Sequence, residues 1–272
     1  MKEIAEKTFI ENDYLGVTLG AALEAEQLTY IDAPLLNENL RTWRNSMVGK
    51  KKPEQLLVLS DSHPDRSIGS RFPECPIVAQ ELVFRIYQNR PVTFHAEEEK
   101  IGADYEKIRN MAGFRWVIPE IVFSDSMDLK IHERVITVEY HPGPSIGCTW
   151  TLLKDVKCVF IGDTVLTDHV PFLADADLLR WEESLALLES PAFDGYQIVS
   201  GRSGLITRAD VARMKEFVVH LRSLLDEGAF GSTADLLKAS DYEKYFSLNK
   251  KIKNDAVERL TYGLKKLTSK SN

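Results

Sequence analysis

The chain has 272 residues, of which 44% are hydrophobic, and this is enough for one domain with a sizeable core. Its formal net charge of -7 at pH 7 argues against the basic surface that nucleic-acid binding requires. The short basic run Lys50-Lys51-Lys52 is expected to be a solvated loop before a strand and not a binding patch.

Cysteine content and hydropathy bear on the cellular compartment. Cys75, Cys148 and Cys158 are odd in number and lack the Cys-x-x-Cys spacing of a zinc or redox site, so no disulfide framework is expected. No run of about 18 uncharged apolar residues predicts a membrane span, and residues 1–7 lack the apolar core of a signal peptide. We therefore expect a cytoplasmic protein with no membrane partner and no nucleic-acid partner.

Hydrophobic periodicity predicts an alternation of strands and helices. Residues 8–32 are typical of a strand, a turn and a second strand, and β-branched runs predict further strands at 58–59, 92–94, 121–123 and 135–138. Helical spacing of apolar residues predicts helices at 79–87, 103–109, 175–189 and 207–227. Thr207 is a candidate N-cap, and Ser232 begins a further helical segment over 232–272. This order indicates an α/β fold.

Polar residues follow several short apolar runs. The run Leu56 to Leu59 leads directly into Asp61-x-His63-x-Asp65-Arg66. Residues two apart on an extended segment point the same way, so positions 61, 63 and 65 are expected to deliver their side chains to one point. Three later segments also combine apolar residues with glycines and polar or charged side chains. They are His141-Pro142-Gly143-Pro144-Ser145-Ile146-Gly147, Val159-Phe160-Ile161-Gly162-Asp163-Thr164 and Ile198-Val199-Ser200-Gly201-Arg202-Ser203-Gly204.

Together these segments resemble the metal-binding motifs of the metallo-β-lactamase superfamily. The first is similar to the signature His-x-His-x-Asp-His, with Asp61 and Arg66 in the places of two histidines. Pro144 falls where the loop TPGHTPG carries the third metal-binding histidine. Asp163 takes the place of the metal-bridging aspartate in LFTGDTLF, and Arg202 that of the histidine in VxPGHG. The chain therefore resembles a divergent member with a degenerate metal-binding motif.

The resemblance covers roughly residues 8–225 and implies the fold. It extends to Leu28-Thr29-Tyr30-Ile31-Asp32, which is similar to the early strand xLIDTG, and to residues 67–81. The implied architecture is a four-layer αββα sandwich, two mixed sheets face to face with helices on both outer sides, in a single domain. We expect this domain at residues 1–230, with a C-terminal helical extension at 231–272 packed on it. Glycines such as Gly162 and Gly201 are expected to allow turns with positive φ.

The family pattern implies two zinc or iron ions that activate a bridging water. Arg66 and Arg202 replace two histidines of the second metal position, and a guanidinium donates no lone pair to a metal, so we expect the second ion to be absent. Buried carboxylates without a cation would repel each other. Our hypothesis is that the two arginines replace the charge of that ion by pairing with the neighbouring aspartates: Asp61, Asp65 and Asp163.

Two functions stay open. We favour a protein that has lost dinuclear hydrolysis while its cleft binds a small-molecule or anionic ligand. The alternative is an atypical mononuclear metal-dependent hydrolase of an ester, thioester, phosphoester or lactone, with Asp65 as general base and Arg66 or Arg202 as anion clamp. Its single zinc, iron or manganese ion would be held by three of the residues that the motif retains or exchanges: Asp61, His63 and Asp163.

Two histidines near the motif are candidates for a fourth ligand. His141 and His169 lie in the right segments, although an ordinary loop histidine is the interpretation that we favour for each. The sequence is compatible with one metal ion or with none, and a homo-oligomer is compatible with either function.

Overall fold

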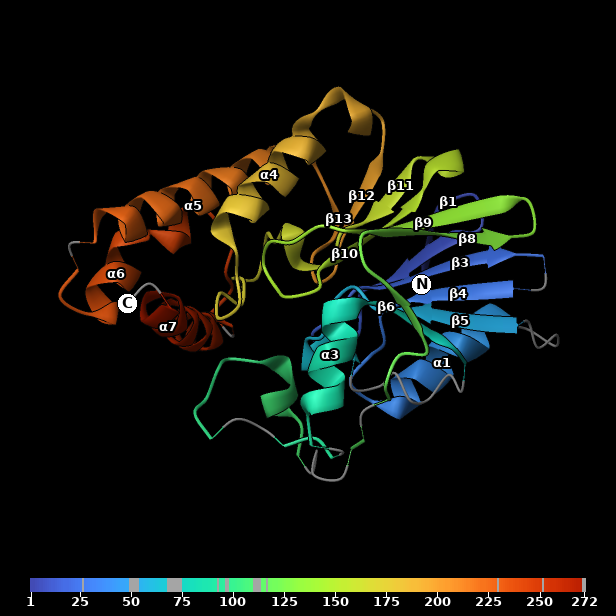
Figure 1. The fold of residues 1–272 in the computed structure, drawn as a ribbon, viewed down its shortest axis with the longest axis horizontal. Coiled ribbons are helices and arrows are strands. Elements are labelled where there is room, and N and C mark those ends of the chain that lie inside the picture. Colours follow the sequence, from blue (N-terminus) through green and yellow to red (C-terminus); the bar gives the residue numbers. More distant parts are fainter. Residues whose placement is uncertain are drawn as a thin grey trace.

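The computed structural model describes residues 1–25, 27–48, 54–67, 75–91, 93–95, 98–109, 114–115, 117–228, 230–250 and 252–270. The basic run Lys50-Lys51-Lys52 and residues 68–74 of the motif region lie outside these ranges. Two sheets pack face to face, with helices on both outer sides (Figure 1).

The first sheet comes from the N-terminal half of the chain. Its strands lie in sequence order, antiparallel from β1 to β4 and parallel from β4 to β7. The seven strands are β1 (Lys2–Ala5), β2 (Thr8–Glu11), β3 (Leu19–Glu24), β4 (Gln27–Ile31), β5 (Glu54–Val58), β6 (Ile77–Gln80) and β7 (Ile121–Phe123).

The second sheet follows, in the order β13-β12-β11-β10-β9-β8. All its neighbours are antiparallel except β11 and β12, which are parallel. Its strands are β8 (Ser126–Ile131), β9 (Arg134–Tyr140), β10 (Thr149–Leu153), β11 (Cys158–Phe160), β12 (Gln197–Ser200) and β13 (Gly204–Ile206).

Alternation of side chains along the strands builds the layers. In β3, Leu19 and Ala21 join the core beneath α1 (Asn37–Val48) and α3 (Glu81–Asn89), while Ala22 joins the core between the sheets. Gly20 also faces the second sheet, where the ring of Phe160 leaves no room for a Cβ atom. The close approach of the two sheets therefore depends on a residue without a side chain.

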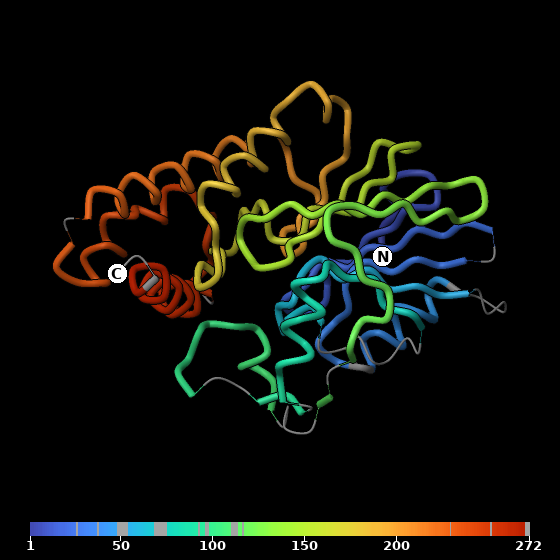
Figure 2. The backbone as a smooth tube through the Cα atoms, in the orientation of Figure 1, coloured from blue at the N-terminus to red at the C-terminus, as the bar shows by residue number. Residues whose placement is uncertain are grey.

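The other outer layer is helical as well. It consists of α4 (Leu178–Glu189), α5 (Arg208–Glu227), α6 (Thr233–Ala239) and α7 (Lys253–Lys270). All four helices share one core with strand residues such as Trp150, and in Figure 2 the red C-terminal segment lies beside the orange one. The four-layer αββα architecture in one domain is thus confirmed, whereas the boundary at residue 230 stays a prediction.

Capping residues and hydrophobic periodicity predicted the bounds of some helices correctly and those of others wrongly. Thr207 caps α5 through a capping box with Asp210, as its position predicted. The helix expected at 79–87 was wrong at its start, because Ala79 and Gln80 complete β6 and the side chain of Gln80 then caps α3. The helix expected at 103–109 is only a 3-10 turn, Asp104–Lys107.

Two strand predictions also need correction. Residues 8–32 contain three strands and not two. In the predicted strand at 92–94, Val92 lies outside the described residues and Thr93 makes only an isolated bridge to Arg115. None of the helices within the described ranges combines the length and hydrophobicity of a transmembrane span.

Candidate functional site

The motif that follows β5 bends into a short helix, α2 (Pro64–Ser67). The expectation of one extended segment through position 65 was therefore wrong, because Asp65 and Arg66 project from a helical turn. This turn is fixed against the end of β4: the Ser60 N–H donates to Asp32 Oδ1 at 2.8 Å, and the Ala33 N–H donates to the Arg66 carbonyl at 2.9 Å. The ends of two parallel strands thus position the motif.

Arg66 is fully buried among three carboxylates. Its Nη2 donates to Asp163 Oδ1, and its Nη1 lies 3.4 Å from Asp32 Oδ2. Its Nε lies 3.3 Å from Asp61 Oδ1, an ion-pair contact without hydrogen-bond geometry. The pairing of Arg66 with aspartates that its charge predicted is therefore present, and Asp32 is a partner that the sequence analysis had not named.

Arg202 approaches the same carboxylate from the other side. Its Nε donates to Asp163 Oδ2 at 2.9 Å, and its Nη1 lies 3.1 Å from Asp65 Oδ2 and 3.3 Å from Asp104 Oδ2. The same Nη1 donates to the Gly16 carbonyl at 2.9 Å. Each oxygen of Asp163 thus contacts a different guanidinium group, and the expected pairing of Arg202 is also present.

His63 is turned toward Arg202. Its Nδ1 lies 3.3 Å from the Asp65 N–H nitrogen and 3.3 Å from Arg202 Nη2, and its ring packs on Phe172 with the centroids 3.9 Å apart. Both groups within hydrogen-bond distance of Nδ1 are obligate donors, while the carboxylate oxygen Asp65 Oδ2 lies farther off at 3.6 Å, so this nitrogen accepts and the proton of the neutral ring lies on Nε2. The Nδ1 lone pair is thus engaged by protein donors, so a metal could bind at this nitrogen only by displacing them.

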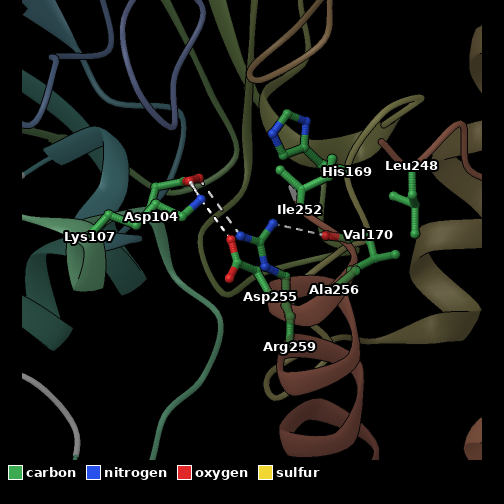
Figure 3. Close-up of a pocket in the computed structure, with 9 residues that line it drawn as sticks. All are labelled: Asp104, Lys107, His169, Val170, Leu248, Ile252, Asp255, Ala256 and Arg259. Atoms are coloured by element: carbon green, nitrogen blue, oxygen red, sulfur yellow. Dashed lines mark hydrogen bonds and ion pairs between the residues drawn. The ribbon is translucent and has the colours of Figure 1, made fainter. Parts of the chain in front are cut away.

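A third arginine comes from the C-terminal helix α7. Arg259 donates to the carbonyl of Gly102. It also donates to the carbonyl of Val170, and its Nη2 lies 3.7 Å from Asp104 Oδ2 (Figure 3). Lys107 bridges Asp104 and Asp255 at 2.7 and 2.8 Å. We call the buried group the arginine–aspartate cluster: Asp32, Asp61, Asp65, Asp104, Asp163, Arg66, Arg202 and Arg259.

Electrostatics in the cluster follow from burial and pairing. Burial alone would raise the pKa of Asp163, but the charges of Arg202 and Arg66 outweigh it and hold this pKa well below its usual range. Burial, followed by the charge of Arg202, keeps the pKa of His63 well below its ordinary value. The aspartate at position 163 is therefore ionised and the histidine neutral at pH 7.

Two glycines lie beside the guanidinium of Arg66, and each is required for a different reason. Gly162 has a φ of 54°, as expected for a turn of this kind. Gly201 does not have a positive φ, so the expected reason was wrong: a Cβ at this position would overlap Arg66 Nη1 and the backbone of Gly162. A glycine at 201 therefore allows close approach and is part of the site.

A cavity of about 150 Å³ lies over the cluster. Its lining combines polar groups with apolar side chains, and the loop that contains Pro144 forms one wall. Ser145 in this loop donates its hydroxyl to Asp61 Oδ2 at 2.8 Å, which ties the wall to the cluster. We call this cavity the cleft cavity. Its lining residues are Ser62, His63, Pro64, Arg90, Ile101, Tyr105, Pro144, Ser145, Ile146, Phe172, Ala174, Asp175 and Tyr262.

The structure brings all six predicted site residues together: Asp61, His63, Asp65, Arg66, Asp163 and Arg202. Their proposed roles as ligands, base or clamp stay predictions. His141 and His169 are engaged elsewhere, with Glu139 at 3.2 Å and Asp168 at 3.0 Å. Sequence reasoning missed Asp104 and Arg259, which come from elements outside the motif and which no spacing rule connects to it.

The donor set does not fit a dinuclear metal centre. The two guanidinium groups lie among the carboxylates that such a centre would use, and they offer donors where a metal needs lone pairs. Within the described ranges, no group of three or more histidine, cysteine, aspartate or glutamate side chains is arranged to hold a metal ion.

Comparison with known proteins identifies the fold. No family model matches the chain, and no curated sequence is significantly similar to it. A metallo-beta-lactamase family protein from Thermus thermophilus superposes with a TM-score of 0.67 and 15% identity, over 96% of this chain and 94% of the other. A metallo-beta-lactamase from Pontibacter korlensis gives 0.62 and 16%, over 80% and 97%.

A third structure, a stereoselective inverting sec-alkylsulfatase from Pseudomonas sp., gives a TM-score of 0.66 and 14% identity. It covers 98% of this chain but only 49% of the sulfatase chain. The chain therefore has the metallo-β-lactamase fold.

Proposed function

We propose that this protein has replaced dinuclear metal hydrolysis with a metal-free, arginine-filled site and that it binds a small ligand in the cleft cavity. The observation that carries this proposal is the placement of Arg66 and Arg202 on opposite oxygens of Asp163. A carboxylate that would bridge two metals in the family pattern is here shared between two guanidinium groups.

Charge balance supports the proposal. Desolvated carboxylates need a compensating cation, and a divalent ion or two arginines supply the same charge. The described carboxylates of the cluster all lie within ion-pair distance of an arginine, at Asp32, Asp61, Asp65, Asp104 and Asp163. Every carboxylate of the cluster thus has a cationic neighbour, and the three guanidinium groups together with Lys107 on Asp104 offset most of the negative charge of the five carboxylates.

The alternative, a mononuclear hydrolase, has weaker support. Its ion would need Asp61, His63 and Asp163, yet the Nδ1 of His63 accepts from Arg202 and both oxygens of Asp163 contact arginines. Metal binding would have to displace these contacts. The measurement of metal content described next distinguishes this function from the metal-free site.

The test is metal content. The protein is purified without chelator or affinity metal, and zinc, iron and manganese are measured by elemental mass spectrometry, with melting temperatures recorded with and without added zinc. The variant is Asp61→Ala/His63→Ala. A matched control is Asp168→Ala/His169→Ala, which removes a contacting aspartate–histidine pair from outside the cluster.

We expect well below about one metal ion per chain and no shift of the melting temperature with zinc. About one ion per chain that is lost in the Asp61→Ala/His63→Ala variant but kept in the control would favour the mononuclear hydrolase. About two ions per chain would overturn the proposal.

A further inference from the structure

Most residues that line the cleft cavity carry apolar or aromatic side chains. They include Ile101, Pro144, Ile146 and Phe172. The cavity volume is about 150 Å³, and an apolar cavity of this size is large enough for a benzene molecule. The volume therefore sets the ligand at roughly the size of one aromatic ring with a small substituent.

Arg90 and Asp175, which bring charge to the wall of the cavity, already have partners within the protein. Arg90 donates from Nη1 to the Ser62 carbonyl at 3.0 Å, and its guanidinium lies 5.2 Å from the centre of the Tyr87 ring. Arg90 and Asp175 also attract each other, so their opposite charges compensate. Neither group is therefore available as a counter-ion for a charged ligand.

His63 and Ser145, two polar residues of the same wall, are bonded to the arginine–aspartate cluster. Nδ1 of His63 accepts from the Asp65 N–H and lies 3.3 Å from Arg202 Nη2. The hydroxyl of Ser145 donates to Asp61 Oδ2 at 2.8 Å. These hydrogen-bonding groups therefore hold the wall on the cluster, and a ligand that needed them would have to break contacts inside the protein.

Phe172 contacts both the cavity and two buried arginines. Its ring lines the cavity and packs on His63 with the ring centroids 3.9 Å apart. The same ring lies 4.1 Å from the guanidinium carbon of Arg259 and 5.1 Å from that of Arg202. Both arginines are buried and lie outside the described lining of the cavity. The aromatic ring therefore covers guanidinium surface that would otherwise attract an anion from the cavity.

We propose that the cleft cavity binds a small neutral molecule, mainly apolar and about the size of one aromatic ring, and that Phe172 sets this preference by separating the cavity from the arginines. This rests on the proposed function, because metal ions in the cluster would add positive charge beside the cavity and favour an anion. A charged ligand would lose water without gaining a counter-ion, whereas a neutral ligand gains from contact with the apolar wall.

The experiment is a ligand-observed NMR titration of the full chain at pH 7 with three probes of one size: the neutral benzyl alcohol, the anion benzoate and the cation benzylamine. Metal content is measured on the same preparations, and circular dichroism checks the fold of each variant. Ile146→Trp fills the cavity. Ile118→Trp is its matched control, because Ile118 is exposed and lies outside the lining. Phe172→Ala and the milder Phe172→Leu remove the ring that covers Arg202 and Arg259.

We expect benzyl alcohol to saturate one site per chain below about 10 mM and to bind at least about tenfold tighter than either charged probe. This binding should be lost in Ile146→Trp and kept in Ile118→Trp. In Phe172→Ala, and to a smaller extent in Phe172→Leu, benzoate should gain at least about threefold in affinity relative to benzyl alcohol, because the guanidinium groups become accessible.

Three results would overturn the neutral ligand class in a metal-free protein: no saturation by benzyl alcohol, equal or tighter binding of a charged probe, or unchanged affinity in Ile146→Trp. An unchanged preference in folded Phe172→Ala and Phe172→Leu would overturn the role of Phe172. Bound metal in the same samples would instead count against the proposed function, so the failures are distinguishable.

Discussion

The Nε of Arg202 lies 2.9 Å from Oδ2 of Asp163, and both side chains are almost entirely removed from solvent. The other oxygen of Asp163 accepts from Arg66. In a buried site, an ion pair of this kind gains from strong Coulomb attraction only if the desolvated groups are fully paired. Removal of Arg66 would leave Asp163 with one guanidinium and take the paired arginine from Asp32 and Asp61, while removal of Arg202 would take it from Asp65.

Replacing Arg66 or Arg202 by methionine is expected to lower the free energy of unfolding by about 3–5 kcal/mol, because removing the guanidinium leaves its aspartate partners as buried charges without that arginine. Urea unfolding followed by circular dichroism measures this. Arg180→Met is the control, since Arg180 forms an exposed pair with Glu183, which is expected to contribute at most about 1 kcal/mol. Equal stabilities of Arg66→Met, Arg202→Met and the wild type would show that the cluster does not stabilise the fold.

The effect of Arg202→Met is expected to depend on pH. A carboxyl group whose pKa is lowered by folding contributes stability above its unfolded pKa, near 3.9, and loses it as the pH falls toward the folded pKa. Without Arg202, Asp163 loses its strongest compensating charge, so its pKa rises and the group takes up a proton in mild acid. The destabilisation by Arg202→Met should thus be largest near pH 7.

The measurement compares wild type and variant by urea unfolding at pH 7 and at about pH 3.5. We expect the difference in unfolding free energy between them to shrink at the lower pH. A difference that is the same at both pH values would mean that protonation of Asp163 is not linked to Arg202.

How far the sequence predicts this site depends on which elements carry its residues. Arg66, Asp163 and Arg202 stand at motif positions beside the ends of buried strands, so their meeting could be predicted, and charge alone indicated that they pair. Asp104 lies on a 3-10 turn where periodicity predicts a helix, and Arg259 reaches Gly102 from a helix 157 residues further along the chain. Such contacts depend on tertiary packing, which no local periodicity encodes.

The boundary between β6 and α3 is a second feature that local sequence patterns did not predict. β6 runs directly into α3, and no glycine or proline lies between Ile77 and Asn89, so composition gave no boundary between strand and helix. The boundary is set instead by pairing of β6 with β7 and by the side chain of Gln80, which accepts from the Leu82 N–H at 2.6 Å.

Gly201→Ala is expected to destabilise the protein by about 1–3 kcal/mol, because the added methyl group would meet Arg66 Nη1 and the Gly162 backbone in a packed interior. Gly231→Ala is a control, since a Cβ there would have only an ordinary contact with Asp235. Thermal unfolding of both variants checks this. The double variant Gly201→Ala/Arg66→Met should be less destabilised than the sum of the two single variants. Arg66→Met removes the Nη1 atom that the added methyl group would meet, so the two effects are not additive.

Arg259→Met tests whether the cluster anchors the C-terminal helix. The change leaves the carbonyls of Gly102 and Val170 without this donor, and each buried acceptor that loses its partner costs about 1–3 kcal/mol. We expect lower stability together with faster amide exchange along α7. Lys265→Met on the same helix removes only an exposed pair with Glu99 and should change neither. If α7 exchanged at the wild-type rate in Arg259→Met, the helix would be held by its apolar contacts alone, chiefly through Leu260 and Leu264.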